Sequence, residues 1–96
     1  MSSEAHVLLL PEHEELLLSI PSDRLARKIA KRLAALATFP RLGAIDELIP
    51  IKGGTDEPRI TYVAPYAIRY RYDSQHNEVR IDAITNERGD TPVRFL

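Results

Sequence analysis

The sequence contains no cysteine, so it can form neither a disulfide bridge nor a thiolate metal site. No apolar stretch approaches the roughly 20 residues that a membrane-spanning helix needs. Residues 1–6 lack the basic region of a signal peptide. Together these absences predict a cytoplasmic protein without a membrane partner.

Neither sign of charge dominates, because 13 basic and 14 acidic side chains give a formal net charge of −1. A globally basic nucleic-acid-binding protein is therefore not indicated. The charges are nevertheless distributed unevenly. The segment 24–32 is strongly basic and contains Arg24, Arg27, Lys28, Lys31 and Arg32. If this segment is helical, a solvated helix face is the simplest interpretation of the cluster.

The first half of the chain predicts a strand followed by two helices. Residues 6–10 form an apolar run that Pro11 ends, and residues 12–19 look helical. Ser22 is a good N-cap for a second helix that ends before Pro40. The inward stripe of this helix would be Leu25, Ile29, Leu33 and Leu36.

The second half predicts a connecting segment and three strands. Residues 41–57 contain glycines and prolines and are interpreted as a long connection. Strands are predicted over 59–64, 66–72 and 77–84. The 96 residues, 44% of them apolar, then form one domain spanning 1–96. The predicted fold class is α+β, with an N-terminal strand, a helical hairpin and a three-stranded antiparallel meander that carries both helices on one face.

The segment 66–72 has two faces of different chemistry. Side chains alternate along a strand, so Ile68, Tyr70 and Tyr72 share one face, whereas Arg69 and Arg71 share the other with Ala67. The first face is expected to pack on the helices. The second face would offer charge to a partner, although strands also place charge outward merely to remain soluble.

The register of the hairpin follows from matching its apolar faces. Tyr72 would pair with Val79, Tyr70 with Ile81 and Ile68 with Ala83. On the other face Arg71 would then lie opposite Arg80, and Arg69 opposite Asp82. The juxtaposition of two arginines hints at an anionic partner.

No catalytic base or metal site is evident. Arginines can stabilise charge that develops on a phosphate, but cleavage also needs a group that accepts a proton. His6, His13 and His76 are predicted to be surface residues away from the arginine face. No cluster has metal-ligand spacing, and no glycine-rich phosphate loop or cofactor site is expected.

Three segments resemble a known family. Residues 36–43 resemble the end of the helical hairpin in toxins of the RelE/ParE superfamily, 65–73 resemble its central strand, and 78–88 resemble its last strand. The resemblance covers roughly residues 6–90. It implies a RelE/ParE-like fold and a toxin of a bacterial type II toxin–antitoxin system, neutralised by a cognate antitoxin. RelE-like members cleave messenger RNA on the ribosome, whereas ParE-like members inhibit DNA gyrase.

The sequence departs from the RelE-like nuclease pattern. Ala67 stands where the family usually has an arginine, and residues 58–62 contain no lysine. No tyrosine follows Arg88, and Phe95 cannot transfer a proton. Asn86 stands where many ParE-like proteins have histidine. These departures favour the ParE-like kind.

The resemblance and the charged face together predict the functional residues. The target-binding candidates are Arg69, Arg71, Arg80, Asn86 and Arg88, of which Arg69, Arg71 and Arg88 are the candidates for catalysis if the chain is an enzyme. The favoured function is growth inhibition by binding gyrase. The alternatives are a ribosome-dependent mRNA endonuclease with a reduced arginine site, and a non-toxic binding module on the same fold.

Overall fold

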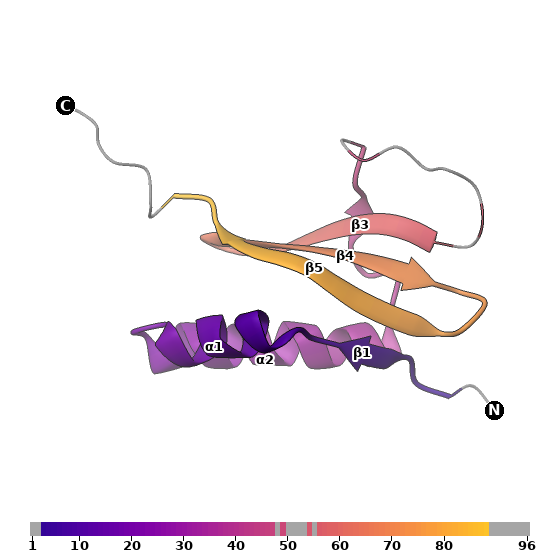
Figure 1. The fold of residues 1–96 in the computed structure, drawn as a ribbon. Coiled ribbons are helices and arrows are strands. Elements are labelled where there is room, and N and C mark those ends of the chain that lie inside the picture. Colours follow the sequence, from indigo (N-terminus) through magenta and orange to yellow (C-terminus); the bar gives the residue numbers. More distant parts are fainter. Residues whose placement is uncertain (1–2, 48, 50–53, 55, 89–96) are drawn as a thin grey trace.

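The protein is an α+β fold in which two helices lie against one face of a single sheet (Figure 1). The computed structural model describes residues 3–47, 49, 54 and 56–88. The elements are β1 (His6–Leu8), α1 (Pro11–Ser19), α2 (Asp23–Thr38), β2 (Ala44–Ile45), β3 (Asp56–Val63), β4 (Tyr66–Asp73) and β5 (Glu78–Asn86). The predicted fold class is thereby confirmed at the level of α+β.

The sheet differs from the prediction in its number of strands and in their order. Its five strands are arranged β1-β5-β4-β3-β2. The predicted meander is present as β3, β4 and β5, which pair antiparallel. However, β1 pairs parallel with β5, with His6 opposite Glu78. The chain between these two strands, which contains both helices and β2 to β4, is long enough for the crossover that a parallel pair requires.

The segment 41–57 is not solely a connection, which corrects the sequence prediction. Its first part forms the short edge strand β2, where Ala44 lies opposite Ile60. Its last two residues already belong to β3. The part around 47–51, which was expected to pack through its aliphatic side chains, lies largely outside the described residues.

Both helices begin and end close to the predicted residues. Ser22 caps α2, because its Oγ accepts a hydrogen bond from the backbone N–H of Leu25 at 3.1 Å. The inward stripe of α2 is confirmed, since Ile29, Leu33 and Leu36 are all buried. This face packs on the side chains of β4 and β5 that point toward the helices and forms the core.

The prediction that His13 lies at the surface is wrong. Its side chain is only 4% exposed, and its Nδ1 accepts a hydrogen bond from the backbone N–H of Leu10 at 3.3 Å. The ring therefore satisfies a donor at the start of α1 that the helix itself cannot pair.

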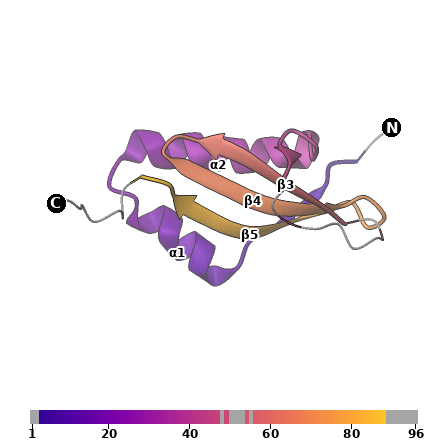
Figure 2. The same cartoon turned by 90° about the horizontal axis from the view of Figure 1, so that it is seen from above.

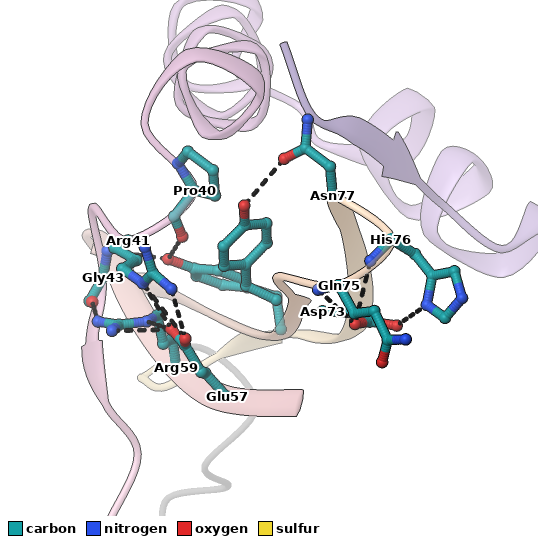
Figure 3. A network of polar contacts seen from close by, with 11 residues as sticks. Pro40, Arg41, Gly43, Glu57, Arg59, Asp73, Gln75, His76 and Asn77 are labelled. Atoms are coloured by element: carbon teal, nitrogen blue, oxygen red, sulfur yellow. Dashed lines mark hydrogen bonds and ion pairs between the residues drawn. The ribbon is translucent and has the colours of Figure 1, made fainter. Parts of the chain in front are cut away.

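Tyr70 ties the end of the helical hairpin to the sheet. It is 1% exposed. Its hydroxyl donates to the backbone oxygen of Pro40 at 2.8 Å and accepts from the N–H of Gly43 at 2.9 Å (Figure 3). A Cβ at Gly43 would lie 2.6 Å from the backbone oxygen of Ile60. Only glycine therefore allows the chain to approach the sheet this closely.

The register of β4 and β5 is as predicted for half of its length. Tyr72 lies opposite Val79 and Tyr70 opposite Ile81, but the register then shifts between Tyr70 and Arg69. The shift places Ile68 opposite Ile84 instead of Ala83. A bulge inserts one extra residue into a strand, so the side chains beyond it point to the opposite face from the one that strict alternation predicts. Here it turns the larger Ile84 into the core, which buries more apolar surface.

Candidate functional site

The face of the sheet opposite the helices, which we call the open face, is turned toward the viewer in Figure 2. Three of the predicted binding residues lie on it, because they alternate with the buried Tyr70, Tyr72 and Val79 along β4 and β5. Arg71 and Arg80 are direct cross-strand neighbours, as the sequence indicated. Arg69 lies on β4 two residues before Arg71, next to the bulge. The structure therefore brings Arg69, Arg71 and Arg80 together.

Each of these three arginines is paired with a carboxylate. Arg69 Nε lies 3.1 Å from Asp46 Oδ2, and Arg71 Nε lies 3.0 Å from Asp82 Oδ2. Arg80 Nη2 donates to both carboxylate oxygens of Asp56 at 2.9 Å. We call this set of three pairs the arginine ladder; it consists of Arg69, Arg71, Arg80, Asp46, Asp56 and Asp82.

The ladder corrects the predicted pairing of Arg69 with Asp82. The bulge places Ala83 opposite Arg69, and Asp82 binds Arg71 instead. Arg69 pairs with Asp46, which is only 3% exposed and which is held at the sheet because its N–H donates to the backbone oxygen of Pro58 at 2.8 Å. Equal numbers of cations and anions leave the ladder without net charge, so it does not offer the excess positive charge that was predicted.

A second ionic cluster lies at the β2–β3 edge of the sheet (Figure 3). Arg41 donates to both carboxylate oxygens of Glu57, from Nη2 to Oε2 at 2.8 Å and from Nε to Oε1 at 3.0 Å. Arg59 Nε also donates to Oε1, at 3.1 Å. Arg59 also donates to the backbone oxygen of Gly43 at 2.7 Å. The hydrogen bond from Arg41 is the main reason that the pKa of Glu57 is lowered, with a further contribution from Arg59.

The tip of the β4–β5 hairpin holds an aspartate–histidine pair. His76 Nδ1 lies 2.6 Å from Asp73 Oδ2, and this hydrogen bond raises the pKa of His76. The imidazole is exposed, as predicted. It lies at the end of the hairpin opposite to Asn86, which pairs with Tyr66 at the start of β4. His76 is therefore not placed to act as a base for the residues that follow β5.

Arg88 lies apart from the ladder, just after β5. Its backbone N–H donates to Asn86 Oδ1 at 3.0 Å, and the neighbouring Glu87 N–H donates to the backbone oxygen of Pro65 at 2.8 Å. A shallow hollow of about 360 Å³ is lined here by Tyr62, Ala64, Pro65, Tyr66, Glu87 and Arg88. We call it the Arg88 hollow. Within the described residues no carboxylate forms an ion pair with the Arg88 guanidinium.

A second hollow adjoins the first and shares Ala64 with it. It has a volume of about 480 Å³ and is lined by Lys28, Lys31, Arg32, Ala35, Val63 and Ala64. Its cations belong to the basic cluster of α2, which was predicted from the sequence to form a solvated helix face. The cluster itself was visible in the sequence. The turn between the strands predicted over 59–64 and 66–72 was also expected, but its position beside α2 was not.

The tyrosines are divided between the two sides of the sheet. Tyr66, Tyr70 and Tyr72 are at most 8% exposed and belong to the core. Tyr62 pairs with Ala67, lies on the open face and is 59% exposed. It is therefore the tyrosine of the described chain that is accessible for stacking or proton transfer.

The comparisons with known proteins add no identification. No protein-family model, curated protein or solved structure matches this chain. Among the described residues, no group of three or more histidine, aspartate or glutamate side chains is arranged to hold a metal ion. None of the described helices is both long enough and apolar enough to cross a membrane.

Proposed function

We propose that this protein is a RelE/ParE-type toxin that inhibits growth by binding a macromolecular target, with gyrase-type inhibition favoured. Its proposed partner is a cognate antitoxin, and its proposed compartment is the cytoplasm. The proposal rests on the resemblance of residues 36–43, 65–73 and 78–88 to that family. The observed order of one strand, two helices and an antiparallel meander is compatible with it.

One observation favours binding over catalysis. Arg69 and Arg71 of the ladder, two of the three candidates for catalysis, are each paired with a carboxylate. An arginine already bound to a carboxylate must exchange that partner before it can bind a phosphate, which costs part of the gain. Arg88 is then the remaining predicted cation, and it lies in the Arg88 hollow.

The same hollow supports the endonuclease as a second candidate. Arg88 could stabilise charge on a phosphate, and the exposed Glu87 carboxylate, which also lines the hollow, could accept a proton. The exposed ring of Tyr62 could stack on a base. This reduced site would use Arg88 without the arginines of the ladder. The third candidate is a non-toxic binding module on the same fold.

Expression in bacteria without a partner tests whether the chain is a toxin. We expect induction of the wild-type chain to arrest growth, and Arg88→Ala to restore it. Arg80→Ala, which removes an arginine that Asp56 already neutralises, is the matched control and should remain toxic. Growth that continues after induction of a soluble wild-type chain would eliminate the toxin proposal. Undiminished toxicity of Arg88→Ala would eliminate Arg88 as its site.

Two assays on the wild-type protein separate the targets. Inhibition of supercoiling by purified gyrase, with messenger RNA intact in induced cells, is the outcome expected here. Cleavage of ribosome-bound message after induction would instead establish the endonuclease, and Glu87→Gln should then abolish cleavage while binding is retained.

A further inference from the structure

The exposed face of α2 carries cations that nothing in the described chain neutralises. Arg24, Arg27, Lys28 and Lys31 are exposed and recur at spacings of three and four residues, so they share one side of the helix. None of them forms an ion pair with a described residue. The one acid at this end of the helix is Asp23, in its first turn.

Arg32 extends this charge to the sheet. Its Nη1 donates to Thr61 Oγ1 and, at 3.2 Å, to the backbone oxygen of Tyr62. Both acceptors are neutral, so the guanidinium is fixed in position but keeps its full charge. It therefore differs from the ladder arginines, whose acceptors are carboxylates.

The hollow between α2 and the β3–β4 turn combines this charge with an apolar floor. Lys28, Lys31 and Arg32 form its cationic side, while the apolar side chains of Ala35, Val63 and Ala64 complete it. Like charges at three- and four-residue spacing slightly destabilise a helix. The arrangement thus works slightly against folding and leaves a surface that is complementary to an acidic partner.

We propose that this hollow, which we call the α2 hollow, binds an acidic segment of a partner protein in which carboxylates alternate with aliphatic side chains. Carboxylates would bind Lys28, Lys31 and Arg32, while the aliphatic side chains would cover Val63 and Ala64. The inference rests on the placement of charge and holds whether or not the chain is a toxin.

A protein segment fits this surface better than a nucleic acid does. The whole chain has a net charge of −1 and a pI of about 6.3, whereas nucleic-acid-binding domains are typically strongly basic. The adjoining Arg88 hollow contains one cation and one carboxylate, Arg88 and Glu87, so it adds no net positive charge that would hold a phosphodiester chain continuing past Ala64. A short acidic peptide can end before reaching that carboxylate.

Fluorescence anisotropy with a labelled peptide tests the proposal directly. The probe is a peptide of about 12 residues with the repeat Glu-Leu-Glu-Ala, long enough to span such a groove. The comparison probes are the same peptide with lysine in place of glutamate, the same peptide with serine in place of leucine, and an oligouridylate of similar length. We expect the acidic peptide to bind most tightly, and the serine version to bind more weakly because it cannot cover the apolar floor.

The decisive variant is Lys28→Gln/Lys31→Gln, and its matched control is Arg71→Gln/Arg80→Gln. Both remove two positive charges, but only the first changes the α2 hollow. We expect the first to weaken binding of the acidic peptide by about tenfold, which corresponds to about 1.4 kcal/mol, and the control to change it by less than about twofold. Circular dichroism verifies that both variants fold.

Three outcomes would overturn the inference. Equal loss of binding in both variants would mean that the peptide responds to net charge alone. Tighter binding of oligouridylate than of the acidic peptide would identify a nucleic acid as the partner class. Absence of peptide binding to the wild-type protein up to about 1 mM, a weak affinity of about 4 kcal/mol, would show that the surface is only a solvated helix face.

Discussion

The arginines of the sheet and the cations of α2 carry the same charge in different surroundings. On the sheet, Arg69, Arg71 and Arg80 each meet a carboxylate within about 3 Å. On α2, Lys28 and Lys31 meet none among the described residues. A count of charges along the chain does not distinguish the two regions, because the distinction depends on which acids the fold brings to which cations.

The difference bears on the roles expected from the sequence. The sheet face was predicted to bind a partner, and the helix face was predicted to be merely solvated. The structure gives the sheet arginines internal partners and therefore a role in holding β2, β3, β4 and β5 together. Among the cations that the structure describes, those without an ion pair are the cations of α2 and Arg88. The following experiments test this division, from the largest expected effect to the smallest.

Replacing Arg69 by methionine should cause the largest loss of stability. The substitution keeps an aliphatic side chain but removes the Arg69 guanidinium from the buried Asp46 carboxylate. Breaking a fully buried pair costs about 3–5 kcal/mol; since Arg69 is 28% exposed, we expect a loss of about 2 kcal/mol. Urea denaturation at neutral pH measures it. A loss below about 0.5 kcal/mol would mean that the sheet does not depend on this pair.

Acidification should weaken the sheet through Glu57. The pKa of Glu57 is lowered in the folded protein by Arg41 and Arg59, so its stabilising contribution is complete above its unfolded pKa of about 4.5 and is lost as the pH falls through the folded value. Urea titrations between about pH 6 and pH 3 should therefore show a falling free energy of unfolding. Glu57→Gln should lower stability at pH 7 by about 1 kcal/mol and flatten this pH dependence. If the free energy of unfolding of Glu57→Gln falls with pH as steeply as that of the wild type, Glu57 is not responsible for the acid sensitivity.

Replacing Arg71 by methionine should have a smaller effect than the change at Arg69. Arg71 and Asp82 are both substantially exposed, with side-chain exposures of 49% and 34%. Exposed ion pairs contribute about 0–1 kcal/mol, so we expect a loss of about 0.5 kcal/mol in the same urea measurement. If the loss of stability equals that of Arg69→Met, burial of the partner carboxylate does not determine how much each ion pair stabilises the protein.

Removing Lys28 and Lys31 should leave stability almost unchanged. Surface substitutions without partners usually change the free energy of unfolding by less than about 0.5 kcal/mol. Lys28→Gln/Lys31→Gln also relieves repulsion along the helix, so a small gain in thermal midpoint is expected. A clear loss of stability would show that these lysines have an internal partner, and the contrast with the sheet would fail.

Much of the fold could be predicted because its signals are local. The cap at Ser22, the stripe through Ile29 and Leu33, and the alternation through Tyr70 and Tyr72 each depend on neighbours within a few residues. The structure agrees with all of these predictions. The register of the hairpin was correct only as far as Tyr70, because strict alternation cannot anticipate a bulge.

The candidate site was predicted less well because its chemistry depends on distant residues. Arg69 and Asp46 are 23 residues apart, and Arg80 and Asp56 are 24 apart. His13 was expected at the surface because histidine is polar, but its ring is buried at the start of α1, where it pairs with Leu10. The α2 hollow likewise needs the β3–β4 turn beside a helix that lies some 30 residues earlier in the chain.

The sequence by itself determined the two helices, the faces that enter the core and the total charge, since periodicity, capping and composition are properties of short segments. Only the tertiary structure decided the parallel pairing of β1 with β5, the bulge that turns Ile84 inward and the neutralisation of the sheet arginines. These features arise from contacts between segments far apart in sequence, and the free energy of such contacts depends on distance and burial. For that reason the cations that the sequence made most conspicuous on the sheet are internally paired, whereas Lys28 and Lys31 of α2 are exposed and form no ion pair with a described residue.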